Sequence, residues 1–184
     1  LRANAYMKIG DGTNAIKDYT KFIEIFPDSY RGYLGRGYIF YAQNNLQAAL
    51  RDYTTAIKLN PGNREAYVQR AAVFYQKKAF DKAEADYTKY IEIHPYNETI
   101  YQVRAWARAM QKNQDGAISD LSEAIKLNPQ NDQNYFARAR HYFQKSEFEN
   151  SVKDLEKTIE LDPTNREEAK PYIELMNSKI SAKP

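Results

Sequence analysis

A phrase of ten residues recurs along the chain, and every copy ends in proline. The prolines stand 34 residues apart, at Pro27, Pro61, Pro95, Pro129 and Pro163. A constant period of this length indicates an array of small structural units, each of which buries its apolar face against its neighbours. Because about five such units fill a chain of 184 residues, the repeat leaves little room for any other kind of domain.

Two apolar stripes within residues 30–63 define the unit. A polar break at residues 43–45 separates them, and Pro61 closes the second stripe because proline disfavours helix in the residue before it. The stripes consist of Tyr33, Gly37 and Phe40, followed by Ala49, Tyr53, Ala56 and Ile57. Spacings of three and four residues place each stripe on one face of a helix. We therefore expect each unit to be a helix, a tight turn and a second helix.

The same layout accounts for the whole chain. We expect a truncated first unit at 1–29, full units at 30–63, 64–97, 98–131 and 132–165, and a closing helix at 166–184. The closing helix carries one apolar stripe, which consists of Ala169, Ile173, Met176 and Ile180. An array needs such a cap, because its last unit otherwise leaves an apolar face in water.

The unit resembles the tetratricopeptide repeat family, whose pattern is W-x2-L-G-x2-Y, then A-x3-F, then P, over about 34 residues. The matching positions in the second unit are Tyr33, Arg36, Gly37, Phe40, Ala49, Tyr53 and Pro61. The likeness covers nearly the full length, because the other units keep the same phase. It implies an all-α fold, namely a right-handed α-solenoid of stacked helix-turn-helix repeats with a C-terminal capping helix.

One arginine and one aspartate recur in every unit, 16 residues apart. The pairs are Arg2 and Asp18, Arg36 and Asp52, Arg70 and Asp86, Arg104 and Asp120, and Arg138 and Asp154. A guanidinium can bind a carboxylate through two parallel hydrogen bonds. Each pair is therefore either a structural clamp between the two helices or one rung of a charged ladder for a ligand. The uniform repetition favours the clamp, because a specific ligand site requires variation between units.

One position of the fourth unit departs from the family pattern. Arg108 stands where the family prefers an aromatic residue. We expect either looser packing of this unit or an arginine stem that extends to solvent.

The chain carries few groups that could support catalysis. It has no cysteine, and neither of its two histidines, His94 and His141, has a partner at the spacing of zinc ligands. The sequence contains no nucleophile elbow and no phosphate-binding glycine motif. We therefore expect a protein that is not an enzyme and that holds no cofactor and no metal.

Charge and hydropathy narrow the choice of partners. The net charge is +3, with basic and acidic residues interspersed, which argues against a nucleic-acid partner. No apolar run approaches the roughly 18 residues that span a bilayer, so we expect no membrane insertion by this segment. The absence of cysteine fits a reducing compartment such as the cytoplasm. Because the chain begins with Leu1 and not Met, we expect it either to come from a longer protein or to have been processed.

The family resemblance implies that the first helices of the units line a concave groove. The groove side chains flank the core stripe, because one residue turns a helix by about 100°. They are Arg31, Leu34, Tyr38, Tyr41, Glu65, Gln69, Tyr75, Gln102, Trp106, Met110, Phe136, Arg140 and Phe143. Such a set of aromatic and amide groups favours a protein or peptide partner, although the same rings also suit simple packing between neighbouring helices.

Two specialised grooves of the family are not matched here. Chaperone-binding members hold a C-terminal carboxylate with Lys, Asn and Arg, whereas this chain has Gly35, Glu65 and Gln69 at matching places. The asparagine ladder of glycosyltransferase members is missing as well. Two hypotheses remain, a scaffold that binds a partner segment in its groove and a self-assembly module within a larger protein. An open edge at the truncated first unit favours the second.

Overall fold

The structure is a computed structural model, and it describes residues 2–181 apart from the side chain of Asn4. The chain divides into two compact parts, each of which contains several of the 34-residue repeats. From here on, unit 1 is the part within residues 1–95, unit 2 is the part within residues 96–184, and a single helix pair is called a repeat. The described residues form α-helices, one short 3-10 turn and no β-strand. Residues 182–184 of the expected closing helix lie outside this range. The fold is the all-α stack of helix pairs that the repeat predicts.

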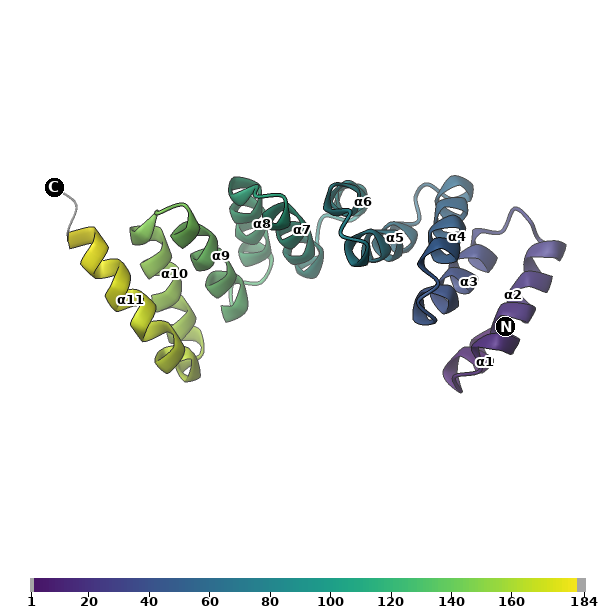
Figure 1. Cartoon of the computed structure of the whole chain (residues 1–184), viewed down its shortest axis with the longest axis horizontal. Helices are drawn as coiled ribbons and strands as arrows, with labels where there is room; N and C mark the ends of the chain where they lie inside the picture. Colours follow the sequence, from purple (N-terminus) through teal and green to yellow (C-terminus); the bar gives the residue numbers. More distant parts are fainter. Residues whose placement is uncertain (1, 182–184) are drawn as a thin grey trace. The chain divides into compact units, whose positions relative to one another are not determined.

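Helices follow one another in pairs within each unit, and consecutive helices pack side by side (Figure 1). Unit 1 contains α1 (Arg2–Lys8), α2 (Gly12–Ile25), α3 (Tyr30–Ala42), α4 (Leu46–Leu59), α5 (Arg64–Gln76) and α6 (Phe80–Ile93). Unit 2 contains α7 (Glu98–Met110), α8 (Gln114–Leu127), α9 (Asp132–Gln144), α10 (Phe148–Leu161), the 3-10 turn Pro163–Asn165 and α11 (Arg166–Ser181). None of the helices within residues 2–181 is both long enough and apolar enough to cross a membrane.

Asparagine side chains cap the N-termini of many of these helices. Asn63 accepts a hydrogen bond from the backbone N–H of Ala66 at 2.9 Å, and Asn113 accepts one from that of Gly116 at 2.9 Å. Asn45 and Asn97 cap α4 and α7 in the same way. The first N–H groups of a helix have no partner within it, so each cap fixes where the helix starts.

The turn from first to second helix has the same backbone in successive repeats. Its left-handed residues are Asn44 (φ 58°), Lys78 (φ 57°), Lys112 (φ 62°) and Ser146 (φ 60°). The next N–H then reaches back into the helix, as Asn45 N does to Phe40 O at 2.7 Å. This pattern satisfies carbonyl groups at the helix end and reverses the chain within a few residues.

Tyr53 of α4 lies at the centre of the core of unit 1. Its side chain is 0 % exposed and packs in one cluster with Ala49 of its own helix and Val73 of α5. Gly37 of α3 makes room for the ring, since a Cβ at this position would lie 2.7 Å from Tyr53 Cε1. The small residue at the helix crossing therefore has a packing role.

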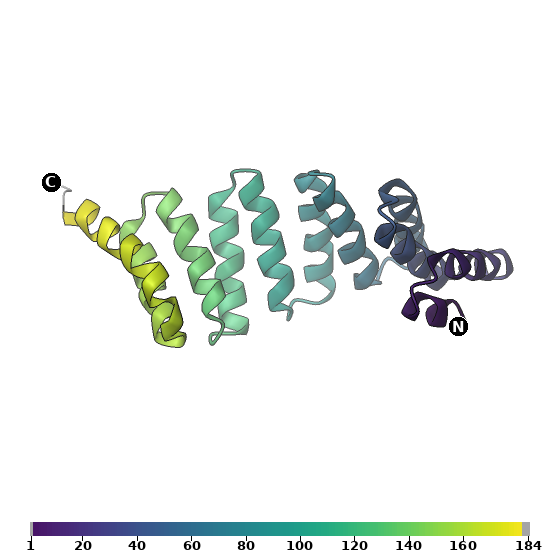
Figure 2. The ribbon, with the colours of Figure 1, turned by 60° about the horizontal axis from the view of Figure 1, so that its bottom comes forward.

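The last helix of unit 2, α11, covers α10 (Figure 2, yellow). Ala169 and Met176 of α11 are 0 % and 1 % exposed, and they pack with Val152 and Leu155 of α10. Ile173 and Ile180 complete the apolar stripe as partly buried neighbours. The stripe thus stabilises unit 2 by about 25 cal/mol for each Å² of apolar surface removed from water.

Candidate functional site

Each repeated arginine binds the aspartate of its own repeat through two hydrogen bonds. In α3 and α4, Arg36 Nε donates to Asp52 Oδ2 at 2.8 Å and Arg36 Nη2 donates to Asp52 Oδ1 at 2.9 Å. This contact raises the pKa of Arg36 above its ordinary value. The same two-bond geometry occurs in Arg2 with Asp18, Arg70 with Asp86, Arg104 with Asp120 and Arg138 with Asp154.

A third contact links the arginine to the preceding repeat. Arg36 Nη1 donates to Thr20 Oγ1 of α2 at 3.1 Å, and Arg138 Nη1 donates to Ser122 Oγ of α8 at 2.9 Å. These hydroxyl groups were not predicted from the sequence, although each stands two residues after the repeated aspartate. Arg36, Arg70 and Arg138 thus each hold three helices together. The repeated arginines of α3, α5, α7 and α9 are only 11–20 % exposed, so they have little reach toward a ligand.

Of the two expectations for Arg108, the one in which its stem extends to solvent is wrong. Its side chain is 19 % exposed, and its Nη1 lies 3.0 Å from Asp120 Oδ1 and donates to the Gly116 carbonyl at 3.3 Å. The guanidinium therefore turns inward and shares Asp120 with Arg104. An ion pair at this position takes the place of the aromatic contact that the family prefers.

The predicted groove residues fall into two sets, one on each unit. They lie on the first helices of the repeats, which are α3 and α5 in unit 1 and α7 and α9 in unit 2; we call this surface the first-helix face of each unit. The two sets differ in how many of their side chains are already bonded or packed within the fold.

In unit 1 the polar residues of the face bind one another. The hydroxyl of Tyr38 donates to Glu65, and Gln69 Nε2 donates to the same Glu65 oxygen at 2.6 Å. The Tyr38 ring lies edge-on to that of Tyr53, with ring centroids 6.1 Å apart. Burial, and then the Glu65 carboxylate, raise the pKa of the Tyr38 hydroxyl. The hydroxyl thus acts as a fixed donor inside the unit.

The other residues of this set are also used in packing. Leu34 and Tyr41 pack against the Tyr53 cluster, and the Tyr75 ring lies 5.4 Å from that of Phe80. The guanidinium of Arg31 lies 6.0 Å from the centre of the Tyr30 ring. A shallow hollow of about 540 Å³ adjoins the N-terminal half of α3. It is lined by Met7, Lys8, Tyr19, Tyr30, Arg31, Leu34, Gly35, Tyr38 and Asn63.

Gln102 of unit 2 belongs to a network of amides around one carboxylate. Gln102 Nε2 donates to Asn134 Oδ1 at 2.6 Å, and Asn134 Nδ2 donates to Glu98 Oε1 at 2.7 Å. Glu98 also accepts hydrogen bonds from Asn128 and Asn131 in the turn between α8 and α9. These contacts fix α7 against α9. Gln102 is therefore already bonded within the fold.

Three of the remaining residues of unit 2 present apolar side chains to solvent. Trp106 is 54 % exposed, Met110 47 % and Phe143 36 %. The α7–α9 hollow, of about 250 Å³, is lined by Trp106, Ala109, Met110, Gln114, Ala137, Arg140, His141 and Gln144. Large exposed apolar side chains grouped on one face are typical of an interaction surface.

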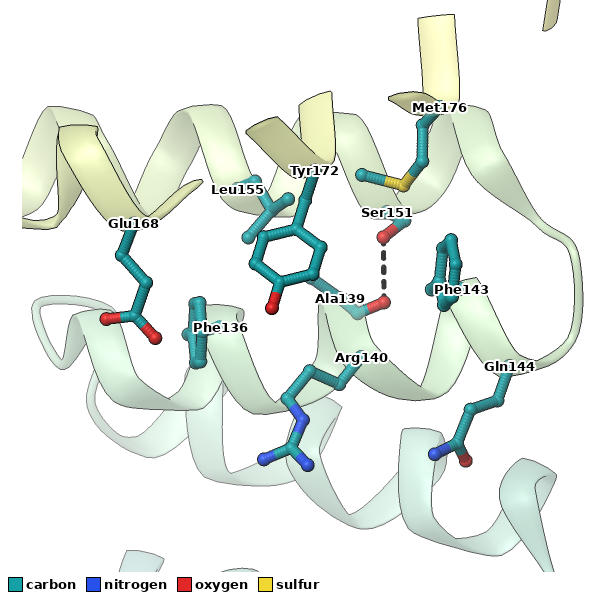
Figure 3. A pocket seen from close by; sticks show the side chains of 10 residues that line it. All are labelled: Phe136, Ala139, Arg140, Phe143, Gln144, Ser151, Leu155, Glu168, Tyr172 and Met176. Carbon is teal, nitrogen blue, oxygen red and sulfur yellow. Dashed lines mark hydrogen bonds between the residues drawn. The ribbon is translucent and has the colours of Figure 1, made fainter. Parts of the chain in front are cut away.

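A second hollow lies on the other side of α9. The α9–α11 hollow has a volume of about 320 Å³ and is lined by Phe136, Ala139, Arg140, Phe143, Gln144, Ser151, Leu155, Glu168, Tyr172 and Met176 (Figure 3). The Ser151 hydroxyl on its floor donates to the Ala139 carbonyl at 2.8 Å. Because Arg140 and Gln144 line both hollows, the two are neighbours separated by one ridge of α9.

Several residues of this second hollow were not predicted from the sequence. Met176 was expected only as a packing residue of the closing helix, and Tyr172 and Glu168 were not expected on the face. The sequence does contain a sign of this hollow. Leu155 occupies the second-helix position that is Tyr53 and Tyr87 in two repeats of unit 1. The shorter side chain leaves space under the face that a tyrosine ring would enter.

Within residues 2–181, His, Asp and Glu side chains form no cluster of three or more that could hold a metal ion. His141 beside the α7–α9 hollow bonds to Gln114, with Nδ1 2.6 Å from Oε1. Burial, and then the charge of Arg140, lower the pKa of His141.

Models of the tetratricopeptide repeat match residues 1–53, 40–98 and 132–165. The chain belongs to the tetratricopeptide repeat family. The matched segments comprise more than half of the chain and include repeats from both units. None of the curated proteins matches the chain in sequence.

Solved tetratricopeptide repeat structures share the fold at low sequence identity. A crystal structure of MamA superposes with a TM-score of 0.81 at 18% identity, covering 90% of this chain and 96% of that one. MamA from Desulfovibrio magneticus RS-1 gives 0.78 at 15% identity, with 88% and 92% covered. YrrB, a tetratricopeptide repeat protein with an unusual peptide-binding site, gives 0.76 at 18% identity, with 90% and 84% covered.

Proposed function

We propose that the chain is a non-catalytic scaffold that binds a segment of a partner protein on its first-helix face. The observation that carries this proposal is the pair of adjacent hollows in unit 2. They lie beside the exposed side chains of Trp106, Met110 and Phe143. Partly exposed aromatic residues at the edge of a pocket are typical anchors of protein interfaces.

The chemistry of the face supports a peptide better than a small polar ligand. Most of the lining of the α9–α11 hollow is apolar, and the Ser151 hydroxyl on its floor is already bonded to the Ala139 carbonyl (Figure 3). The hollow is at the lower end of the roughly 300–1,000 Å³ range of ligand pockets, so it suits a single side chain. The peptide-binding site of YrrB, which has the same fold, is consistent with this use.

Selection of displayed peptides on the purified chain tests the proposal. We expect a synthetic copy of a selected peptide to bind the wild type and to lose at least about tenfold in affinity with Phe143→Ala, since anchor residues commonly contribute 2 kcal/mol or more. Leu127→Ala is the matched control, because Leu127 is an apolar residue of α8 that is 39 % exposed and lines neither hollow. Equal weakening by both variants would show that binding is not on the first-helix face.

Self-association is a second candidate function, and exposed apolar side chains at α1 and α2 of unit 1 favour it. Ile9 is 75 % exposed, Ile25 68 % and Phe26 52 %, around the ends of α1 and α2. Light scattering over a range of concentrations should then report a mass above that of one chain. Ile25→Lys combined with Phe26→Ser should restore the single-chain mass. A wild type that stays monomeric at high concentration would exclude this candidate.

A further inference from the structure

We propose that the partner segment carries an acidic group between two apolar side chains. In this arrangement the apolar side chains enter the α7–α9 and α9–α11 hollows, and the acidic group binds Arg140 on the ridge between them. The inference rests on the proposed function and adds the chemical class of the partner. It is carried by the position of Arg140, which lines both hollows.

Arg140 differs from the repeated arginines. Those bind an aspartate of their own repeat, whereas Arg140 forms no ion pair with any residue in the described range 2–181. Its side chain is exposed and extends over the face, away from the apolar floor of the α9–α11 hollow (Figure 3). An exposed guanidinium offers a planar pair of donors that matches a carboxylate.

The other titratable groups of the lining favour one place for an acidic group. They are His141 beside the α7–α9 hollow and Glu168 beside the α9–α11 hollow. Glu168 lies near Phe136, at the end of the α9–α11 hollow away from Gln144 (Figure 3). An acidic group near Glu168 would be repelled, so the favourable place for it is the ridge at Arg140. Protonation of His141 at low pH would strengthen this preference.

The spacing of the hollows suits a short extended peptide. Packed helices lie about 8–10 Å apart, so two hollows on opposite sides of α9 are about one helix spacing apart. A polyproline II segment advances about 3.1 Å per residue and returns to the same side every three residues. Apolar residues three positions apart therefore reach both hollows, and the residues between them pass over Arg140.

Three synthetic peptides test the charge. They share the flanks Gly-Ser and contain the cores Leu-Pro-Glu-Leu, Leu-Pro-Gln-Leu and Leu-Pro-Lys-Leu, with blocked ends. Because Trp106 is the only tryptophan and lines one hollow, its fluorescence reports binding to the full chain directly. We expect the Glu peptide to bind about fivefold more tightly than the Gln peptide, as for one exposed ion pair, and the Lys peptide to bind most weakly.

Arg140→Gln should remove the difference between the Glu and Gln peptides while the Gln peptide keeps its wild-type affinity. Arg51→Gln, at an exposed arginine of α4 in unit 1, is the control and should leave the difference intact. Salt at about 0.5 M should also reduce the difference, because exposed charges are screened. Equal affinities of the two peptides for the wild type, or a difference that survives in Arg140→Gln, would overturn the inference.

Phe143→Ala separates failure of the inference from failure of the proposed function. If this variant weakens all three peptides and charge has no effect, the face binds peptides but Arg140 does not select acidic ones. If none of the three peptides binds, the inference is overturned, because its chosen ligand class is then wrong. If peptides selected without regard to charge also fail to bind, the proposed function falls with it.

Discussion

Tyr53 in unit 1 and Leu155 in unit 2 occupy the same position of the repeat. The Tyr53 ring is 0 % exposed and fills the space between α3 and α5 as far as Tyr38 on the first-helix face. Leu155 is also buried, at 3 % exposed, but it lies under a hollow of about 320 Å³. The face is therefore filled above Tyr53 and open above Leu155.

The difference extends to the polar groups of the face. In unit 1, Tyr38, Glu65 and Gln69 bind one another, so a partner would have to displace existing hydrogen bonds. In unit 2, Arg140 is exposed and the apolar residues beside it are half exposed. The same repeat is therefore closed by its own side chains in one unit and leaves exposed side chains in the other.

Truncation of the two residues gives the largest expected effect. Tyr53→Ala should lower the free energy of unfolding by about 3–5 kcal/mol, because it empties a filled core position. Leu155→Ala should cost about 2 kcal/mol, the low end for a buried leucine, because an open hollow already adjoins it. Thermal and urea unfolding followed by circular dichroism measure both. A larger loss at Leu155 than at Tyr53 would break the comparison.

For peptide affinity we expect the opposite order from stability: truncation in unit 2 should weaken binding more than truncation in unit 1. Trp106→Ala in unit 2 should weaken a face-binding peptide by about 2 kcal/mol, the usual loss for an aromatic anchor. Tyr75→Ala in unit 1 should change the affinity by less than about 0.5 kcal/mol, because the Tyr75 ring is packed on Phe80. Calorimetric titration with a selected peptide gives both values. If the two losses were equal, both units would contribute to the site.

The helices were predictable because each depends on signals that lie close together in the sequence. The period, the closing prolines and the polar breaks at residues such as 43–45 mark helix ends without any knowledge of distant contacts. The pairing of Arg36 with Asp52 was foreseeable as well, because the two residues recur at a fixed distance. Its third partner, Thr20, lies in the preceding repeat and required the stacked geometry.

The candidate site was less predictable, because exposure depends on the residues beneath the face. A helical pattern places Tyr38 and Arg140 at the same repeat position, although one is bonded to Glu65 and the other is exposed. Tyr38 has Glu65 of the next first helix within reach, whereas Arg140 forms no ion pair within the described residues. Likewise, Arg108 turned inward because Asp120 was within reach.

Removing the hydroxyl group of Tyr53 tests how the filled core position of unit 1 contributes to stability. The Tyr53 hydroxyl is buried and has no hydrogen-bond partner within the described part of the chain. Tyr53→Phe should therefore raise the free energy of unfolding by about 1 kcal/mol, because it removes a desolvated polar group and keeps the ring.

Tyr87→Phe is the control for this change. Tyr87 occupies the next equivalent position and is 5 % exposed, yet its hydroxyl is not among the buried groups that lack a partner. We expect no gain in stability at Tyr87. A loss of stability in Tyr53→Phe would mean that the hydroxyl has a favourable contact in solution.

The smallest expected effect tests a feature that the two units share. Lys78 in unit 1 and Lys112 in unit 2 have φ angles of 57° and 62°, a region that costs residues with a Cβ about 1 kcal/mol. Lys78→Gly and Lys112→Gly should each raise the free energy of unfolding by about 0.5 kcal/mol, since glycine relieves the strain but gains freedom in the unfolded chain. Asn44→Gly should gain less, because asparagine tolerates this backbone. Unequal gains for the two lysines in parallel urea titrations would show that the turns, and not only the layers under the face, differ between the units.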